Sequence, residues 1–130
     1  MLAAGKGHGE VLETLLQQGA DVNARDVSGK SALAWAAGAG KTRALRLLLK
    51  GGADPDLEDT LGRTALMYAA IAGDAAGVTI LLDEGVDATA RDNLGRTAGA
   101  WAEQRGQQAV LEVLVRSLQP APSVSFSQGE

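Results

Sequence analysis

Residues 59–74 read DTLGRTALMYAAIAGD, and nearly the same pattern recurs 33 residues earlier and 33 residues later. Residues 26–41 read DVSGKSALAWAAGAGK, and residues 92–107 read DNLGRTAGAWAEQRGQ. Residues 24–56 and 57–89 share 12 identities in 33 positions, and columns of Asp, Leu and Gly stay in register along the chain. A fixed period of this length indicates a repeat architecture, in which each copy is one supersecondary unit.

Each copy is predicted to begin with a short Ala-rich helix. Ser31, Thr64 and Thr97 stand where this helix starts, and a hydroxyl there can accept a hydrogen bond from a free backbone N–H. A glycine follows the helix and can take the left-handed conformation that ends it. These closing glycines are Gly40, Gly73 and Gly106.

A second helix in each copy is predicted from apolar residues spaced i, i+1, i+4 and i+5, which form one stripe along the helix. The stripes are Val11, Leu12, Leu15 and Leu16; Ala44, Leu45, Leu48 and Leu49; Gly77, Val78, Leu81 and Leu82; and Val110, Leu111, Leu114 and Val115. One copy cannot bury its stripe alone, so we expect the copies to stack on each other. The polar segments between copies carry Asp and Gly at turn positions.

These motifs resemble the ankyrin repeat family, whose pattern runs D-x-x-G-x-T-P-L-H-x-A-A-x-x-G-H, then a Leu-rich helix, then G-A-D-V-N-A. The segments QQGADVNA, KGGADPDL and DEGVDATA match the second part of that pattern. The resemblance implies an all-α fold, an ankyrin-repeat solenoid of stacked antiparallel helix pairs joined by hairpin-like turns. The family's Pro and His are replaced here by Ala or Met, which should cost stability without changing the fold.

The repeats divide the chain into an ankyrin repeat array over residues 1–118 and a tail over residues 119–130. Within the array we expect a partial repeat at 1–23, repeats at 24–56 and 57–89, and a C-terminal capping repeat at 90–118. The first copy starts inside its own first helix, so either the chain is a piece of a longer array or a shortened helix pair caps the stack. The tail, QPAPSVSFSQGE, has little to bury and is expected to be disordered.

Composition limits the class of protein. Hydrophobic residues make up 45% of the chain and charged residues 22%, as in soluble globular proteins, and there is no Cys. We expect an intracellular protein, cytoplasmic or nuclear, without membrane insertion and monomeric. The net charge of −4 makes nucleic acid an unlikely partner.

The stretch AGAGKT at 37–42 looks like the end of a phosphate-binding loop, which needs the pattern G-x-x-x-x-G-K-[ST] after a strand. Trp35 stands where the first glycine should be, and the preceding residues read as helix. We therefore interpret AGAGKT as a helix–turn–helix corner. His8 is the only His, and Cys is absent, so the sequence predicts no catalytic residues, no metal site, no cofactor and no small-molecule substrate.

One large residue recurs at the same slot of every copy. These residues are Leu2, Trp35, Tyr68 and Trp101. Since the slot lies between Ala-rich positions and is usually Leu in the family, we expect a ladder of large side chains through the core. The alternative is an aromatic stripe on a binding surface.

In proteins that this chain resembles, partners bind to the turn tips and to the exposed side of the first helix. That implies partner-binding residues at Arg25, Val27, Ser28, Lys30, Glu58, Thr60, Leu61, Arg63, Ile71, Arg91, Asn93, Leu94, Arg96, Gln104 and Arg105. Six of these are positive and one is negative, so we expect an acidic or amphipathic segment of another protein as the partner.

The function implied is a non-catalytic protein–protein interaction module, such as an adaptor, scaffold or inhibitor. The alternative is the regulatory or targeting segment of a larger multidomain protein, for example an enzyme.

Overall fold

The computed structural model describes residues 21–118, which form six α-helices joined by turns. The helices are α3 (Ala32–Gly38), α4 (Thr42–Lys50), α5 (Ala65–Ala72), α6 (Ala75–Asp83), α7 (Ala98–Gln104) and α8 (Gln108–Leu118). The longest, α8, has 11 residues. None of these described helices combines the length and the apolar character that crossing a bilayer requires.

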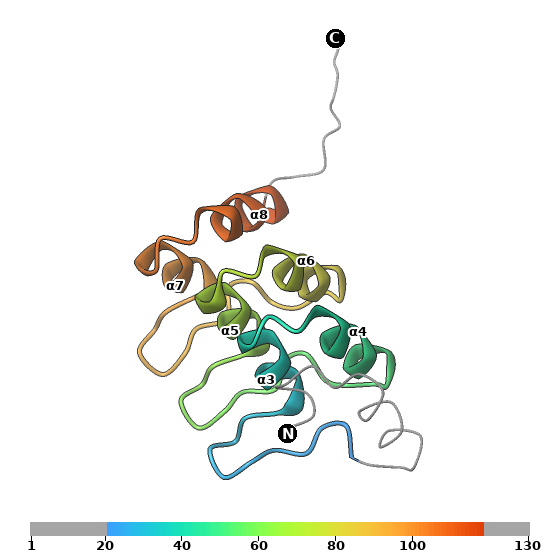
Figure 1. Cartoon of the computed structure of the whole chain (residues 1–130). Helices are drawn as coiled ribbons and strands as arrows, with labels where there is room; N and C mark the ends of the chain where they lie inside the picture. The colour runs from blue at the N-terminus through green and yellow to red at the C-terminus, as the bar shows by residue number, and fades with distance from the viewer. Residues whose placement is uncertain (1–20, 119–130) are drawn as a thin grey trace.

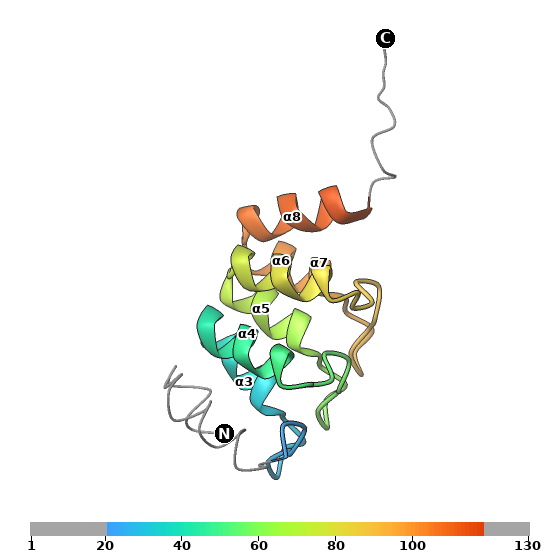
Figure 2. The same cartoon turned by 90° about the vertical axis from the view of Figure 1, so that its right-hand side faces the viewer.

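The helices form two layers. Helices α3, α5 and α7 pack side by side in one layer, while α4, α6 and α8 follow one another in the second (Figures 1 and 2). Each helix of the first layer also packs on its successor in the chain, so the repeating brick is an antiparallel helix pair. This is the all-α ankyrin solenoid that the sequence predicted.

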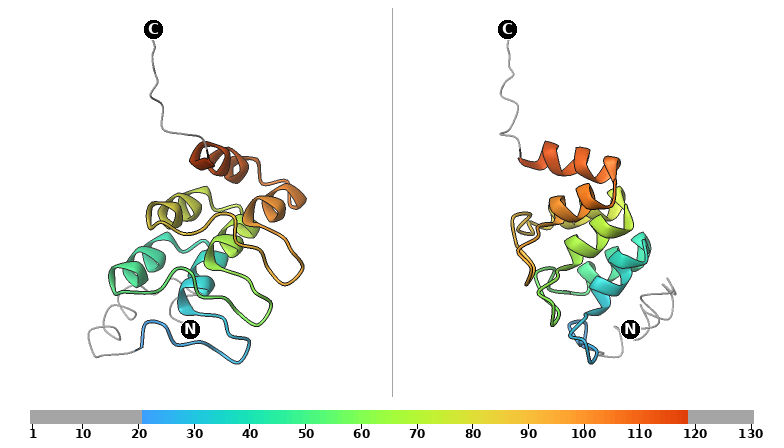
Figure 3. Two further views of the ribbon diagram at one scale, coloured as in Figure 1. Left: turned by 180° about the vertical axis from the view of Figure 1, so that it is seen from behind. Right: turned by 90° about the vertical axis from the view of Figure 1, so that its left-hand side faces the viewer.

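The turns between helix pairs extend away from both layers, all on the same side of the stack (Figures 1 and 3). At the base of the first described turn, Arg25 and Ser31 form an isolated antiparallel bridge. The turns are therefore hairpin-like, as expected, and within residues 21–118 they do not assemble into a sheet.

The predicted helix starts and ends are confirmed. The Ser31 hydroxyl accepts a hydrogen bond from the Ala34 amide at 3.2 Å, and the Thr97 hydroxyl accepts one from Ala100 at 3.1 Å. Gly73 ends α5 in the left-handed region, at φ 75°. Gly40, at φ 67°, joins α3 to α4, so AGAGKT is a corner between two helices and follows no strand.

The core lies between the layers and is made largely of Ala and Leu. The three predicted stripes within residues 21–118 are buried along most of their length, with Leu45, Val78 and Val110 each fully shielded from solvent. Val115 is an exception, because 54% of it is exposed on α8. It lies at the end of the described stack, where the described residues place no further helix over α8. The first stripe, Val11 to Leu16, lies outside the described residues.

The last repeat presents polar side chains on the end of α7 and the start of α8. Glu103, Gln104 and Arg105 are exposed. Gln107 is half-buried instead, because its Nε2 donates a hydrogen bond to the Ile71 carbonyl of the preceding repeat at 3.0 Å. This side chain therefore ties the last repeat to its neighbour.

Candidate functional site

An aspartate closes the turn of each described repeat. One oxygen of Asp26 accepts hydrogen bonds from the backbone N–H groups of Ser28 at 2.9 Å and Lys30 at 3.0 Å. The later copies repeat this arrangement at 2.9 Å, with Asp59 bound by Leu61 and Arg63 and Asp92 bound by Leu94 and Arg96. The turn that carries the predicted tip residues is thus held by its own carboxylate.

The second carboxylate oxygen binds the aromatic residue nine positions later. The Trp35 indole N–H donates to Asp26 at 2.9 Å, and the Trp101 indole N–H donates to Asp92 at 3.0 Å. The Tyr68 hydroxyl donates in the same way to Asp59. An indole or phenol needs a hydrogen-bond partner when it is covered, and here the turn supplies it.

The expectation that the aromatic slot is part of the core is confirmed for Trp101, which belongs to the buried core, and is wrong for Trp35. Trp35 is 37% exposed and Tyr68 is half-buried, whereas Trp101 is only 4% exposed. The side chains lie along the turns because their polar groups reach the aspartates there. Leu2, the fourth member of the predicted ladder, lies outside the described residues.

Cationic side chains fill the spaces between successive rings. The Lys30 ammonium lies 4.0 Å from the centroid of the Trp35 ring and 4.2 Å from that of Tyr68. The Arg63 guanidinium carbon lies 5.9 Å from the Tyr68 centroid and 4.9 Å from that of Trp101. Rings and cations therefore alternate across three repeats. We call this array the cation–π ladder.

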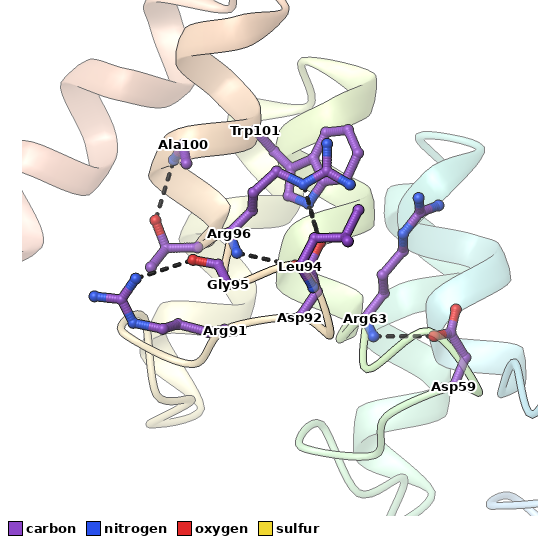
Figure 4. A network of polar contacts seen from close by, with 10 residues as sticks. Asp59, Arg63, Arg91, Asp92, Leu94, Gly95, Arg96, Ala100 and Trp101 are labelled. Carbon is purple, nitrogen blue, oxygen red and sulfur yellow. Dashed lines mark hydrogen bonds and ion pairs between the residues drawn. The ribbon is translucent and has the colours of Figure 1, made fainter.

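The C-terminal end of the ladder holds further positive charge. The guanidinium carbon of Arg96 lies 3.9 Å from the Trp101 centroid, and that of Arg105 lies 5.8 Å from it. Figure 4 shows Arg96 lying against the Trp101 indole, with Arg63 extending from the preceding turn. The Arg96 Nε also forms an ion pair of 3.5 Å with Asp92. Cations over an indole face are attracted by its negative ring centre.

The contacts within the ladder shift the pKa values of the groups that form it. Hydrogen bonds from the Ser28 hydroxyl and the Trp35 indole lower the pKa of Asp26 to about 2. Burial lowers the pKa of Lys30, although Asp26 and Asp59 act against this. Burial acts to raise the pKa of Asp92, but hydrogen bonds from Arg96 and Trp101 outweigh it and leave the pKa lowered.

The ionisation of Tyr68 offers a direct test of the ladder. Burial raises the pKa of its phenol from 10.0 to about 12, and the hydrogen bond to Asp59 adds to the effect. The folded state therefore favours the protonated phenol, so this stabilisation is full below pH 10 and disappears as the pH rises towards 12. Because Tyr68 is the only tyrosine, its phenolate absorbance reports it alone. We expect Asp59→Asn to lower this pKa and the matched Asp26→Asn to leave it unchanged, and equal shifts in the two variants would contradict the assignment.

Hydrogen bonds between neighbouring turns keep the tips in register. The Thr60 amide donates to the Ser28 carbonyl at 3.0 Å, and the Asn93 amide donates to Leu61 at the same distance. The Asn93 side chain adds a bond of 3.0 Å to the Thr60 carbonyl, and Arg25 donates to the Glu58 carbonyl at 3.2 Å. The tips therefore form a continuous edge rather than independent loops.

Apolar side chains project from this edge. Val27 is completely exposed, Leu94 is 75% exposed and Leu61 is 52% exposed. Large apolar groups in a row on a surface mark a site of interaction more often than scattered ones do.

Most of the predicted partner-binding residues fall on this edge and on the ladder, whereas Ile71 lies in α5 and Gln104 in α7. Eleven of the fifteen are exposed: Arg25, Val27, Ser28, Glu58, Thr60, Leu61, Arg91, Asn93, Leu94, Gln104 and Arg105. The other four, Lys30, Arg63, Ile71 and Arg96, are half-buried. The prediction omitted Trp35 and Tyr68, and the signal that could have found them is the aspartate nine residues before each ring.

A comparison with models of protein families shows the family of the chain. A family model described as ankyrin repeats (3 copies) matches residues 1–92 and, in a second match, residues 40–123. No curated protein matches the chain. Together with the stacked helix pairs and hairpin-like turns, these matches show that the chain belongs to the ankyrin repeat family.

Proposed function

We propose that this chain is a non-catalytic interaction module that binds a segment of another protein across its turn tips and its concave face, the face formed by α3, α5 and α7. Ankyrin repeats are generally protein–protein interaction modules. The observation that carries the proposal is the ladder, because it holds three cations in fixed positions beside an edge of exposed apolar groups. Such pre-ordering reduces the entropy lost on binding.

The partner segment is acidic and amphipathic. The carboxylates nearest the ladder, those of Asp26, Asp59 and Asp92, already accept hydrogen bonds from their own turns and rings. The arginines of this surface therefore retain donors for acidic groups of a partner, while Leu61 and Leu94 contact its apolar side chains. Charge complementarity of this kind accelerates encounter and excludes wrong partners. An adaptor, scaffold or inhibitor would all use the surface in this way.

Charge reversal tests the proposal. A partner captured by the wild-type chain should bind the double variant Arg63→Glu, Arg96→Glu at least tenfold more weakly. The reason is that like charges would then face the acidic groups of the partner. The matched control reverses Arg43 and Arg46, two exposed arginines of α4 in the other helix layer. Calorimetry at several salt concentrations measures both affinities and their salt dependence.

The neutral pair Arg63→Gln and Arg96→Gln separates lost attraction from damage to the ladder, and circular dichroism checks that each variant is folded. The neutral pair should weaken binding less than the reversed pair. If the reversed pair binds the captured partner as tightly as the wild type, and with the same salt dependence, the proposed surface is wrong.

A further inference from the structure

Three arginines surround one ring at the C-terminal end of the ladder. Arg63 reaches Trp101 from the turn before α5, Arg96 from the turn before α7, and Arg105 from the end of α7. Within residues 21–118, Trp35 has one such cation and Tyr68 has two. Positive charge therefore converges on Trp101 more than on any other ring of the described ladder.

The carboxylate beside this cluster does not balance it. Asp92 is 5% exposed, and its two oxygens accept hydrogen bonds from Leu94, Arg96 and the Trp101 indole. Its ion pair with Arg96 is long, at 3.5 Å. The Nε atoms of Arg63 and Arg96 are buried and have no hydrogen-bond partner in the part of the chain that the structure describes. Within the described residues the one ion pair of the cluster is thus that of Arg96 with Asp92, a carboxylate that is already engaged.

The first space of the ladder shows the contrast. Lys30 lies there between two rings, and the carboxylates of both Asp26 and Asp59 stabilise its charge. That space holds a single ammonium, which the two carboxylates attract and Arg63 repels. The Trp101 cluster differs in having guanidinium groups in place of an ammonium and in having an excess of positive charge.

We propose that Arg63, Arg96 and Arg105 form a binding site for the phosphate group of a phosphorylated residue in the partner segment. A phosphorylated side chain carries a charge of about −1.5 to −2 at neutral pH, which matches the excess at the cluster better than a single carboxylate does. A guanidinium stacked on an indole keeps its in-plane N–H donors free, and their planar fork fits phosphate oxygens. The inference rests on the proposed function and adds the chemical group that this end of the ladder binds.

An NMR titration with inorganic phosphate tests the cluster itself. The chain has two tryptophans, so the Trp35 indole N–H serves as an internal control for that of Trp101. We expect phosphate to shift the Trp101 indole signal and the Arg63 and Arg96 Nε–H signals saturably. Acetate at equal ionic strength should bind at least tenfold more weakly. Arg105→Gln should weaken phosphate binding about fivefold or more, while Arg91→Gln, a turn arginine bonded to the Gly95 carbonyl at 2.9 Å, should not.

A peptide library then separates a phosphorylated protein segment from free phosphate. Its members carry one fixed phosphoserine between degenerate positions, and parallel libraries carry Ser or Glu there. We expect the phosphoserine library to bind at least tenfold more tightly than either, and to bind more tightly than inorganic phosphate. If the phosphoserine library binds no more tightly than inorganic phosphate, the assignment to a protein segment is overturned.

The proposed function and this inference fail separately. If phosphate and acetate shift the Trp101 signals equally, or if Trp35 responds as strongly as Trp101, the phosphate site is wrong. If the reversal of Arg63 and Arg96 nevertheless abolishes binding of a captured partner, the proposed interaction surface stands. The surface then recognises only carboxylates of that partner. If reversal also leaves the captured partner bound, both assignments fall.

Discussion

Replacing Asp92 with Ala should lower the free energy of unfolding by about 3 kcal/mol. The carboxylate is 5% exposed and accepts hydrogen bonds from two backbone N–H groups and from the Trp101 indole. Its removal leaves the buried indole N–H and two part-buried backbone N–H groups unpaired, and it leaves Arg96 without its ion-pair partner. A buried donor that loses its acceptor costs more than the hydrogen bond itself contributed, since no water replaces it.

The matched control is Asp26→Ala, at the same position of an earlier repeat. Asp26 makes equivalent hydrogen bonds, but it is half-buried and its ring, Trp35, is 37% exposed. Water can reach the donors there, so we expect a clearly smaller loss. Urea unfolding followed by circular dichroism measures both variants. Equal losses would show that burial of the aspartate–tryptophan pair does not set its contribution.

The helix framework could be predicted from the sequence because its signals are local. A hydroxyl at Thr64 and a glycine at Gly73 lie at the two ends of one short apolar run, and each acts on backbone groups within a few residues. The 33-residue period then indicates that every copy has the same helices and the same apolar stripe to bury. Stacking follows because a single copy leaves its stripe uncovered.

The ladder could not be predicted because it depends on contacts between copies. The sequence placed Lys30 and Arg63 on the turns as positive groups, but the ring that each one meets in addition to its own belongs to the next repeat. Apolar character alone made the core the better interpretation for Trp35 and Tyr68. The aspartate in each turn supplies a hydrogen-bond acceptor and directs the polar group of each ring towards the turn.

Burial of the ring rises along the ladder, from Trp35 through Tyr68 to Trp101. Trp101 is covered by guanidinium groups from its own and the preceding repeat, whereas Trp35 meets only one ammonium among the described residues. Identical slots in the sequence therefore acquire different environments from their neighbours. The repeat period predicts the position of each ring but not its exposure.

Replacing Gly62 with Ala should destabilise the protein by about 3 kcal/mol, and Gly95→Ala should cost only about 1 kcal/mol. Both glycines occupy the same turn position in the left-handed region, at φ 75° and 80°. The conformational cost of a side chain is therefore nearly the same in the two variants. Their surroundings differ, because an added Cβ at Gly95 meets nothing within 4 Å.

At Gly62 the added Cβ would clash with the Asn93 side-chain oxygen and would lie 3.0 Å from the Asn93 backbone nitrogen. The amide at that nitrogen donates to the Leu61 carbonyl, so relieving the clash means separating two turns. The difference between the two variants thus isolates the packing of one turn on the next, at about 2 kcal/mol.

The double variant Gly62→Ala with Asn93→Ala divides this difference further. It removes the side-chain clash and keeps the backbone contact, so we expect it to recover only part of the loss, after correction for Asn93→Ala alone. Hydrogen exchange at the Asn93 amide reports whether the turns separate locally. If Gly62→Ala and Gly95→Ala cost the same, the tips do not pack on each other tightly enough to form the single edge on which the proposed binding surface depends.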